Sequence, residues 1–335
     1  MNRQNITVAG AGILGLWQAL TLARRGHHVR LIDHSAKPFQ SAASSHAGAM
    51  LSPDCEGEAA PRIVSELGKR GLELWRATYA GVISNGSLVV AAARDLPDLV
   101  RFEKLTNGWQ KIPPEDIAAL EPDLADRFPV ALYFPGEAHV ITPDALTALM
   151  SDVYAAGVEV KWGERFSPEN FDGLIVDCRG LGARDDLPTL RGVRGERVLV
   201  RARDVNLSRP VRLLHPRHPL YVVPWADGRF LIGATMIESE ESGPVTVRSA
   251  LELLGAAYAV HPAFGEAEIL EMAAGVRPAF PDNVPRVFVK DDGRRLFVNG
   301  AYRHGFLLAP VLAEAVADFI ERGAAHPLLA LLARE

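Results

Sequence analysis

Three glycines near the start of the chain have the spacing that binds a dinucleotide. Gly10, Gly12 and Gly15 follow a short apolar run at residues 6–9. The first glycine permits a tight turn, the second lets the backbone approach a pyrophosphate, and the third lets the next helix pack closely on the strand. A second apolar run ends at Asp33, where a carboxylate can accept hydrogen bonds from an adenosine ribose. The spacing predicts a strand, a turn, a helix and a second strand around a dinucleotide diphosphate.

Two arginines far along the chain could bind an anion. Arg277 and Arg303 each follow the expected end of a strand, where open α/β sheets place their ligands. A guanidinium offers planar, charge-assisted hydrogen bonds that suit a carboxylate. Either arginine alone is as readily a surface charge or half of an internal ion pair. Because both lie beside glycine-rich turns, the pair favours a carboxylate site.

The composition restricts the class of protein. The chain has 335 residues, 48% of them hydrophobic and 23% charged, with a net charge of -5, which is typical of a globular enzyme and not of a nucleic-acid-binding protein. Its two cysteines, Cys55 and Cys178, are too few for a disulfide framework, so a reducing, cytoplasmic location is expected. No apolar run reaches the roughly 18 residues of a membrane span, and no spacing of histidines and cysteines indicates a metal site.

The elements that must position these residues form an α/β pattern. Residues 62–80 have apolar positions at helical spacing, and residues 171–182 are typical of a buried parallel strand that ends in a glycine-rich turn. Shorter strands are expected elsewhere, with a hairpin at Ala226-Asp227-Gly228. We predict a Rossmann-like, doubly wound nucleotide-binding domain with an inserted β-rich α+β substrate domain. The first comprises residues 1–83, 141–194 and 274–323, the second residues 84–140 and 195–273, and residues 324–335 form a C-terminal tail.

Several segments carry local predictions. Residues 131–140 are expected to form a strand pair around a Pro-Gly turn. A helix is expected with Thr142 as its cap and Pro143 at its first position, and a closing helix at residues 309–320. The Ser/Ala/Gly-rich residues 41–50 are expected to line the bound nucleotide, with a flexible linker as the alternative.

A resemblance to a known family rests on five stretches taken together. They are the glycine motif with Asp33, the loop Ser45–Met50, the stretch Tyr221–Thr235, the segment Gly275–Asp282 and the ending Asn299–Pro310. In this order, and over nearly the whole chain, they resemble the D-amino-acid oxidase family of flavoproteins. Within that family, the chain is most similar to the glycine oxidase branch associated with thiazole formation for thiamine. The resemblance implies FAD, bound non-covalently.

The resemblance also implies roles for individual residues. Arg277 would hold the substrate carboxylate, Arg303 would line the same site, and Tyr221 would offer its hydroxyl to the substrate. The alternative for Tyr221 is a strand aromatic packed in the core. Cys178 is expected to be inert and buried, and not a covalent flavin anchor. The expected cofactor contacts are Gly10, Gly12, Ile13, Leu14, Gly15, Asp33, His34, Ala43, Ser44, Gly48, Ala49, Met50, Phe166, Ala301, Tyr302, His304, Gly305, Phe306 and Leu307.

Two further expectations concern charge near the cofactor. The closing helix is expected to begin near Leu308, with its positive end at the pyrimidine edge of the flavin, where reduction places negative charge. One departure from the family pattern lies in the turn after the strand at residues 171–177. The turn is Cys178-Arg179-Gly180 here, in place of small residues, and it puts an arginine where the nucleotide is expected.

The function implied by the resemblance is oxidation of glycine or another small amino acid. Hydride transfer from the neutral amine to FAD would give an imino acid that water hydrolyses, and dioxygen would reoxidise the flavin to yield hydrogen peroxide. A role in thiamine thiazole biosynthesis is expected, and assembly into a homo-oligomer is left open. The nearest alternatives are a D-amino-acid dehydrogenase and a sarcosine-type oxidase of the same superfamily. The alternative from another class is a non-catalytic flavin-binding subunit.

Overall fold

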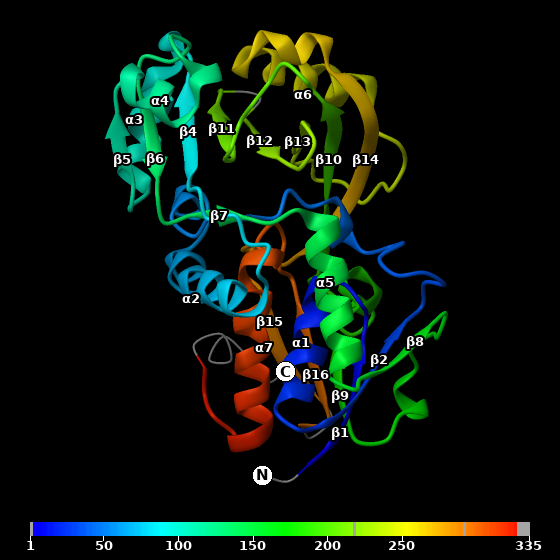
Figure 1. The fold of residues 1–335 in the computed structure, drawn as a ribbon. Helices are drawn as coiled ribbons and strands as arrows, with labels where there is room; N and C mark the ends of the chain where they lie inside the picture. The colour runs from blue at the N-terminus through cyan, green and yellow to red at the C-terminus, as the bar shows by residue number, and fades with distance from the viewer. Residues whose placement is uncertain (1–2, 217–218, 291–292, 327–335) are drawn as a thin grey trace.

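Two β-sheets, one above the other in Figure 1, form the framework of the protein. The computed structural model describes residues 3–216, 219–290 and 293–326 of the chain. A six-stranded sheet contains the strands predicted around the glycine motif, and an eight-stranded sheet lies at the other end of the molecule. The predicted combination of an α/β unit with a β-rich unit is confirmed.

The six-stranded sheet is parallel except at one edge, where β15 runs antiparallel to β16. Alternate residues of β1 face opposite sides, because side chains alternate along a strand. Ile6 and Val8 pack in the core beneath the helices, and Ala9 packs in the core of the other face. In sheet order, the strands are β15 (Arg286–Lys290), β16 (Arg295–Asn299), β9 (Leu174–Asp177), β1 (Asn5–Ala9), β2 (His28–Asp33) and β8 (Glu159–Trp162).

Helices α1, α5 and α7 cover one face of this sheet, and α2 packs against α7. The core between them contains fully buried side chains such as Leu16, Leu146 and Leu312. The other face is covered by shorter segments that place Phe171 and Phe280 against it. The bounds of the helices are α1 (Ile13–Arg24), α2 (Arg62–Thr78), α5 (Thr142–Ala155) and α7 (Gly305–Arg322).

Helix α7 begins earlier than the sequence pattern predicts. It starts at Gly305, several residues before the expected Leu308, and contains Pro310 in its second turn. A proline has no N–H, so the carbonyl four residues before it, that of Phe306, loses its helical partner. The indole Nε1 of Trp75 donates to this carbonyl at 2.6 Å instead. The Phe306 carbonyl therefore has a hydrogen-bond partner despite the proline.

The eight-stranded sheet is mostly antiparallel, with β11 and β4 as a parallel pair. One face packs on α6, and Tyr221 lies on the other face beside Met50. In sheet order, the strands are β14 (Glu268–Ala279), β10 (Arg191–Arg201), β13 (Arg229–Gly233), β12 (Leu220–Pro224), β11 (Val211–Leu214), β4 (Ser87–Ala91), β6 (Ala131–Phe134) and β5 (Gln110–Ile112). The helices beside it are α3 (Leu96–Leu105), α4 (Pro114–Leu120) and α6 (Val247–Val260).

The structure confirms one local prediction and corrects two. The predicted hairpin joins β12 and β13, and Asp227 and Gly228 both have positive φ in its turn. Residues 131–140 do not pair with each other as expected, because β6 pairs with β4 and β5, whereas β7 (Ala138–His139) pairs with β3 (Met50–Leu51). Thr142 is the first residue of α5 and not its cap, because its hydroxyl donates to the Ala47 carbonyl at 2.6 Å. Both corrected segments make long-range contacts that local patterns do not encode.

The long strands β10 and β14 run between the two units. They pair from Arg191 opposite Ala279 to Arg201 opposite Glu268, and Figure 1 shows them descending from the large sheet toward the six-stranded unit. The predicted domain boundaries near residues 194 and 273 fall within these strands, and the division into domains stays a prediction. Of the predicted tail, residues 327–335 lie outside the described part of the chain.

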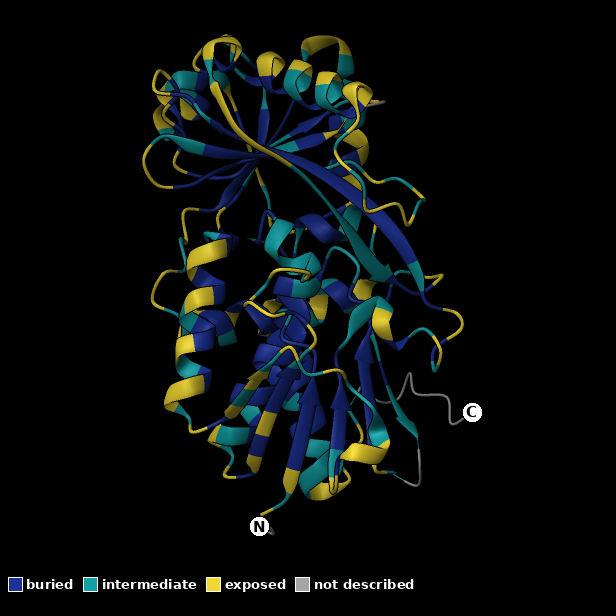
Figure 2. Cartoon of the chain, turned by 90° about the vertical axis from the view of Figure 1, so that its right-hand side faces the viewer, coloured by how far each residue is buried: buried dark blue, intermediate teal, exposed yellow. Residues whose placement is uncertain are grey.

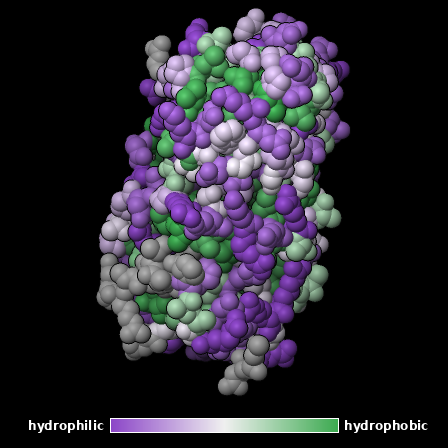
Figure 3. Space-filling model, turned by 90° about the vertical axis from the view of Figure 1, so that its left-hand side faces the viewer, coloured by the Kyte–Doolittle hydropathy of each residue, from purple (hydrophilic) through white to green (hydrophobic). Residues whose placement is uncertain are grey.

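Burial follows the layers of the fold. Figure 2 shows both sheets largely buried, with the exposed residues mainly on the outer faces of the helices and in the loops, and the first half of the edge strand β14 is also exposed. Figure 3 shows a mainly hydrophilic face with smaller apolar areas on it. No helix in the described ranges is long and apolar enough to cross a membrane.

A buried histidine where the two units meet predicts a loss of stability in acid. His139, in β7, is fully buried, and burial lowers its pKa from 6.5 to about 4, although the Pro224 backbone partly offsets this. Between those pH values the unfolded chain binds the proton more readily than the folded one, so stability falls as the pH falls. Between pH 7 and pH 4 we expect protonation of His139 in the unfolded chain to lower the free energy of unfolding by about 3 kcal/mol. Urea unfolding of the protein and of His139→Gln at pH 7 and pH 4 measures the effect, and an equal pH dependence in both would contradict it.

Candidate active site

A cavity of about 1150 Å³ extends between the two sheets and brings together residues from all parts of the chain. Nearly all of the residues predicted to touch a cofactor or substrate line it. Gly15 and Leu307 do not, because Gly15 packs against the Gly10 turn and Leu307 packs against α2. The predicted residues in the lining are Gly10, Gly12, Ile13, Leu14, Asp33, His34, Ala43, Ser44, Gly48, Ala49, Met50, Phe166, Tyr221, Arg277, Ala301, Tyr302, Arg303, His304, Gly305 and Phe306.

The glycine motif shapes one end of the cavity. Gly10 has φ +97°, a left-handed conformation that suits glycine, and a Cβ there would press on the Cys178 carbonyl. A Cβ on Gly15 would overlap the carbonyl oxygen of Gly10, so the start of α1 can approach the β1 turn only with a glycine at this position. Because Gly12 is the N-cap residue of α1 and lines the cavity, the positive end of the helix is at the cavity wall.

Asp33 and Ser44 complete this end. The Asp33 carboxylate accepts hydrogen bonds from the N–H groups of Ala11 and Ser35, both at 2.8 Å. Each carboxylate oxygen keeps a further lone pair for a ligand hydroxyl. The Ser44 hydroxyl accepts from the Ile13 N–H at 3.2 Å, and this ties the loop of residues 41–50 to α1. The loop therefore forms part of the wall.

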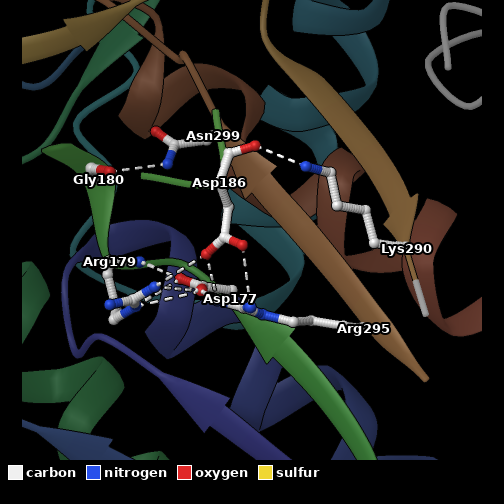
Figure 4. A network of polar contacts seen from close by, with 7 residues as sticks. All are labelled: Asp177, Arg179, Gly180, Asp186, Lys290, Arg295 and Asn299. Carbon is white, nitrogen blue, oxygen red and sulfur yellow. Dashed lines mark hydrogen bonds and ion pairs between the residues drawn. The ribbon is translucent and has the colours of Figure 1, made fainter. Parts of the chain in front are cut away.

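Arg179, in the turn at residues 178–180, forms an ion pair and so does not place a free charge at the nucleotide end of the cavity. Figure 4 shows Arg179 turned toward Asp177, which is fully buried, and its Nη2 donates to that carboxylate at 2.8 Å. Arg295 donates to the same oxygen from β16, also at 2.8 Å. The Arg179 guanidinium also lies 4.4 Å from the centre of the Phe166 ring. Arg179 thus lines the cavity as a paired cation that packs on Phe166. Cys178 is buried beside it, and burial raises the pKa of its thiol well above the usual value, so the thiol stays protonated.

Arg277, Tyr221 and Arg303 converge at the other end of the cavity. Tyr221 faces it because Leu220 and Val222, its neighbours in β12, point into the core beneath α6. Burial raises the pKa of Tyr221, while the nearby Arg277, Arg212 and Arg303 guanidinium groups act to lower it. Four side chains from four parts of the chain therefore share one electrostatic environment.

The two predicted arginines differ in their partners. Arg277 Nη1 donates to the Thr235 carbonyl at 3.1 Å, and its guanidinium occupies the space beside Gly195 that a larger residue would fill. No carboxylate within the described residues forms an ion pair with it. Arg303, by contrast, donates from Nε to Glu56 at 2.9 Å. Of the two, Arg277 is the cation with capacity for a ligand carboxylate.

Glu56 and Arg212 are cavity residues that the sequence did not single out. Glu56 lies in a short 3₁₀ helix, Cys55–Glu58, and is 8% exposed. Burial would raise its pKa, but Arg303, His304 and Arg212 together hold the pKa well below the usual range. The carboxylate is therefore ionised in the folded protein. Nothing in the local sequence except a cluster of acidic residues, DCEGE at 54–58, marks this position.

The chain matches the DAO family model, described as FAD dependent oxidoreductase, over residues 5–319. It belongs to this family. The predicted membership in a flavoprotein family is thereby confirmed, and the protein is an FAD-dependent oxidoreductase.

Relatives and solved structures agree with this assignment. A Rhizobium etli protein provisionally named as the thiamine biosynthesis oxidoreductase ThiO is 50% identical over 313 residues, which are 93% of this chain and 95% of the relative. Glycine oxidase of Geobacillus kaustophilus is 29% identical over 362 residues, covering 96% of this chain and 94% of the relative. The crystal structure of glycine oxidase from Geobacillus kaustophilus superimposes with a TM-score of 0.83 over all of both chains at 24% identity, and so shares the fold.

The residues present fit an FAD molecule. The cavity is large enough for a dinucleotide, and the N-terminus of α1 and the Asp33 carboxylate stand at one end of it. The first turn of α7, with Gly305 and Phe306 in the cavity wall, provides backbone N–H groups at the other end, beside Tyr221 and Arg277. A dinucleotide lying along the cavity would thus place its nucleotide at the glycine motif and its reactive ring near Arg277.

Proposed function

We propose that this protein oxidises glycine or another small amino acid, with Arg277 binding the substrate carboxylate. The observation that carries the proposal is the Arg277 guanidinium, which forms no ion pair with any described residue and lies near Tyr221 in the cavity that begins at the glycine motif. A role in thiamine biosynthesis goes with this activity, as the name of the Rhizobium etli relative suggests, and within it we assign the protein to formation of the thiazole. A cytoplasmic location is proposed with it.

The chain contributes binding and electrostatics to this reaction. Arg277 would form charge-assisted hydrogen bonds with the substrate carboxylate, and the Tyr221 hydroxyl would donate a further one. Two fixed contacts to the carboxylate orient the α-carbon, and such positioning supplies much of the rate of a transfer reaction. When bound, FAD would supply two-electron chemistry: it would accept a hydride from the substrate α-carbon, and dioxygen would take up the two electrons with two protons to give hydrogen peroxide. The positive end of α7 would stabilise negative charge at the flavin end of the cavity.

We assign the cofactor-holding residues in two groups. Gly10, Gly12, Asp33 and Ser44 would hold the adenosine and pyrophosphate, and Ala301 to Phe306 would contact the flavin ring. Cys178 is a protonated, buried thiol, so the cofactor would be held without a covalent bond. These roles are proposals that follow from which residues line the cavity.

An amine panel tests the proposal and separates it from its alternatives. Glycine, small D-amino acids and sarcosine should be assayed side by side with an oxygen electrode and with an electron-accepting dye. Oxygen uptake with primary amino acids supports the oxidase. Dye reduction without oxygen uptake would indicate a dehydrogenase, activity confined to sarcosine would indicate a sarcosine-type oxidase, and no activity with any amine would indicate a non-catalytic flavin protein.

A further inference from the structure

Glu56 is a buried carboxylate in the middle of the cations at the reactive end of the cavity. Its Oε2 accepts from Arg303 Nε at 2.9 Å and lies 2.9 Å from Arg303 Nη2 and 3.1 Å from His304 Nδ1. Its other oxygen, Oε1, lies 3.8 Å from Arg212 Nη2. One carboxylate thus faces three groups that could each bind an anion. Arg212 and Arg303 contribute cationic donors in addition to Arg277.

The protein holds Glu56 firmly in this position. The 3₁₀ helix that carries it is fixed by a second buried carboxyl group, that of Glu137, which accepts the Cys55 N–H at 2.8 Å and the Ser87 hydroxyl. Glu137 is fully buried, and burial raises its pKa. The Glu56 N–H also donates to the Ser52 carbonyl at 3.2 Å. Glu56 therefore acts as a fixed charge and not as a mobile surface acid.

The result is an uneven distribution of positive charge in the cavity. Arg303 and Arg212 face the Glu56 carboxylate, and Arg197 pairs with Glu271 at 3.0 Å. Arg277 faces no carboxylate among the described residues. Among the described arginines at this end of the cavity, Arg277 is thus the uncompensated guanidinium, which matches a ligand with a single acidic group. A second acidic group on the ligand, placed near Arg303, would also lie near the Glu56 carboxylate. The two negative charges would repel each other.

We propose that Glu56 restricts the site to amino acids with a single carboxylate, because its negative charge compensates Arg303 and Arg212 and would repel a second acidic group beside them. This inference rests on the proposed function, because it presumes that Arg277 binds the substrate carboxylate. In this role Glu56 determines specificity without touching the reacting atoms. Removing its charge would release cationic donors for a second acidic group on the ligand.

Binding of unreactive carboxylates tests this directly. Acetate and malonate differ by one carboxylate, and the flavin absorbance of the purified holoenzyme reports their binding. For Glu56→Gln we expect the affinity for malonate relative to acetate to rise by about tenfold or more, since hydrogen bonds to charged groups become available. Glu58→Gln is the matched control, because Glu58 lines the same cavity and loses the same charge, but no described residue forms an ion pair with it. We expect little change in the ratio for this control.

Kinetics give a second measurement on the same proteins. The kcat/KM ratio of D-aspartate to D-alanine should rise in Glu56→Gln by about the same factor and stay near the wild-type value in Glu58→Gln. A D-aspartate to D-alanine ratio that is the same in Glu56→Gln and Glu58→Gln, whether unchanged from wild type or raised in both, would overturn the role of Glu56. If Glu56→Gln fails to fold, the unaltered holoenzyme still decides the question, because malonate binding as tight as acetate binding would contradict the inference. Failure of the wild-type protein to oxidise any amine would instead refute the proposed function.

Discussion

Replacing Arg277 with methionine is expected to raise the KM for glycine or a small D-amino acid by about 100-fold or more, equivalent to about 3 kcal/mol, while bound FAD is retained. The reason is that Arg277 forms no ion pair with a described residue and so can bind a ligand carboxylate, whereas Arg303 already donates to Glu56. Methionine keeps much of the length of the side chain but removes the charge and all donors. Steady-state kinetics and the flavin content of the purified variant measure both parts of the prediction.

Arg286→Met provides the control for this experiment. Arg286, the first residue of β15, forms an ion pair with Asp282 in the loop before that strand. It does not line the cavity. Its loss should change the KM little. A KM that is unchanged in Arg277→Met, or raised equally in both variants, would remove the carboxylate-binding role from Arg277.

The second large effect is expected at the opposite end of the cavity. Gly15→Ala should abolish or strongly weaken FAD binding, because the added Cβ would overlap the Gly10 carbonyl oxygen and force α1 away from the turn after β1. The nearest obstacle is backbone, which cannot rotate aside as a flexible side chain can. Overpacking of this kind costs about 1 to 3 kcal/mol or more in stability. Flavin absorbance per mole of protein and the thermal unfolding midpoint measure the two consequences.

The same substitution at Gly255 separates this packing effect from a general effect of alanine. Gly255 lies in α6, and a Cβ there would meet nothing within 4 Å. Gly255→Ala should therefore leave FAD content unchanged and stabilise the helix by about 0.5 to 1 kcal/mol. If Gly15→Ala instead retains full FAD content and the wild-type melting temperature, the role assigned to the glycine motif is wrong.

The part of the site that could be predicted from the sequence is the part that short motifs encode. Gly10, Gly12, Gly15 and Asp33 lie within one strand–turn–helix–strand unit, so their spacing alone predicts a dinucleotide site there. Gly10, Gly12 and Asp33 do line the cavity, whereas Gly15 packs behind the turn. The carboxylate-binding role of Arg277 depended on a resemblance and on its place after a predicted strand. In the structure Arg277 lies within β14, near the end of the strand, and not beyond it.

The residues that sequence reasoning missed depend on contacts between distant segments. Glu56 matters because it meets Arg303, almost 250 residues later, and no local pattern encodes that pairing. Helix α7 starts earlier than the expected Leu308 and contains Pro310, and the Trp75 indole that satisfies the carbonyl exposed by this proline comes from another helix. The departure at Arg179 looks unfavourable in the sequence, yet the buried Asp177 neutralises the charge. The first two cases depend on tertiary contacts, whereas the Arg179–Asp177 pair is a contact between residues two positions apart.

Anaerobic reduction of the bound flavin tests the central claim most directly. The purified holoenzyme, mixed without oxygen with glycine, sarcosine and a series of small D-amino acids, is followed by its visible absorbance. If the cavity oxidises an amino acid held by Arg277, at least one primary amino acid will bleach the yellow flavin, and Arg277→Met will need a much higher concentration to do so. A flavin that none of these amines reduces would contradict the proposed activity.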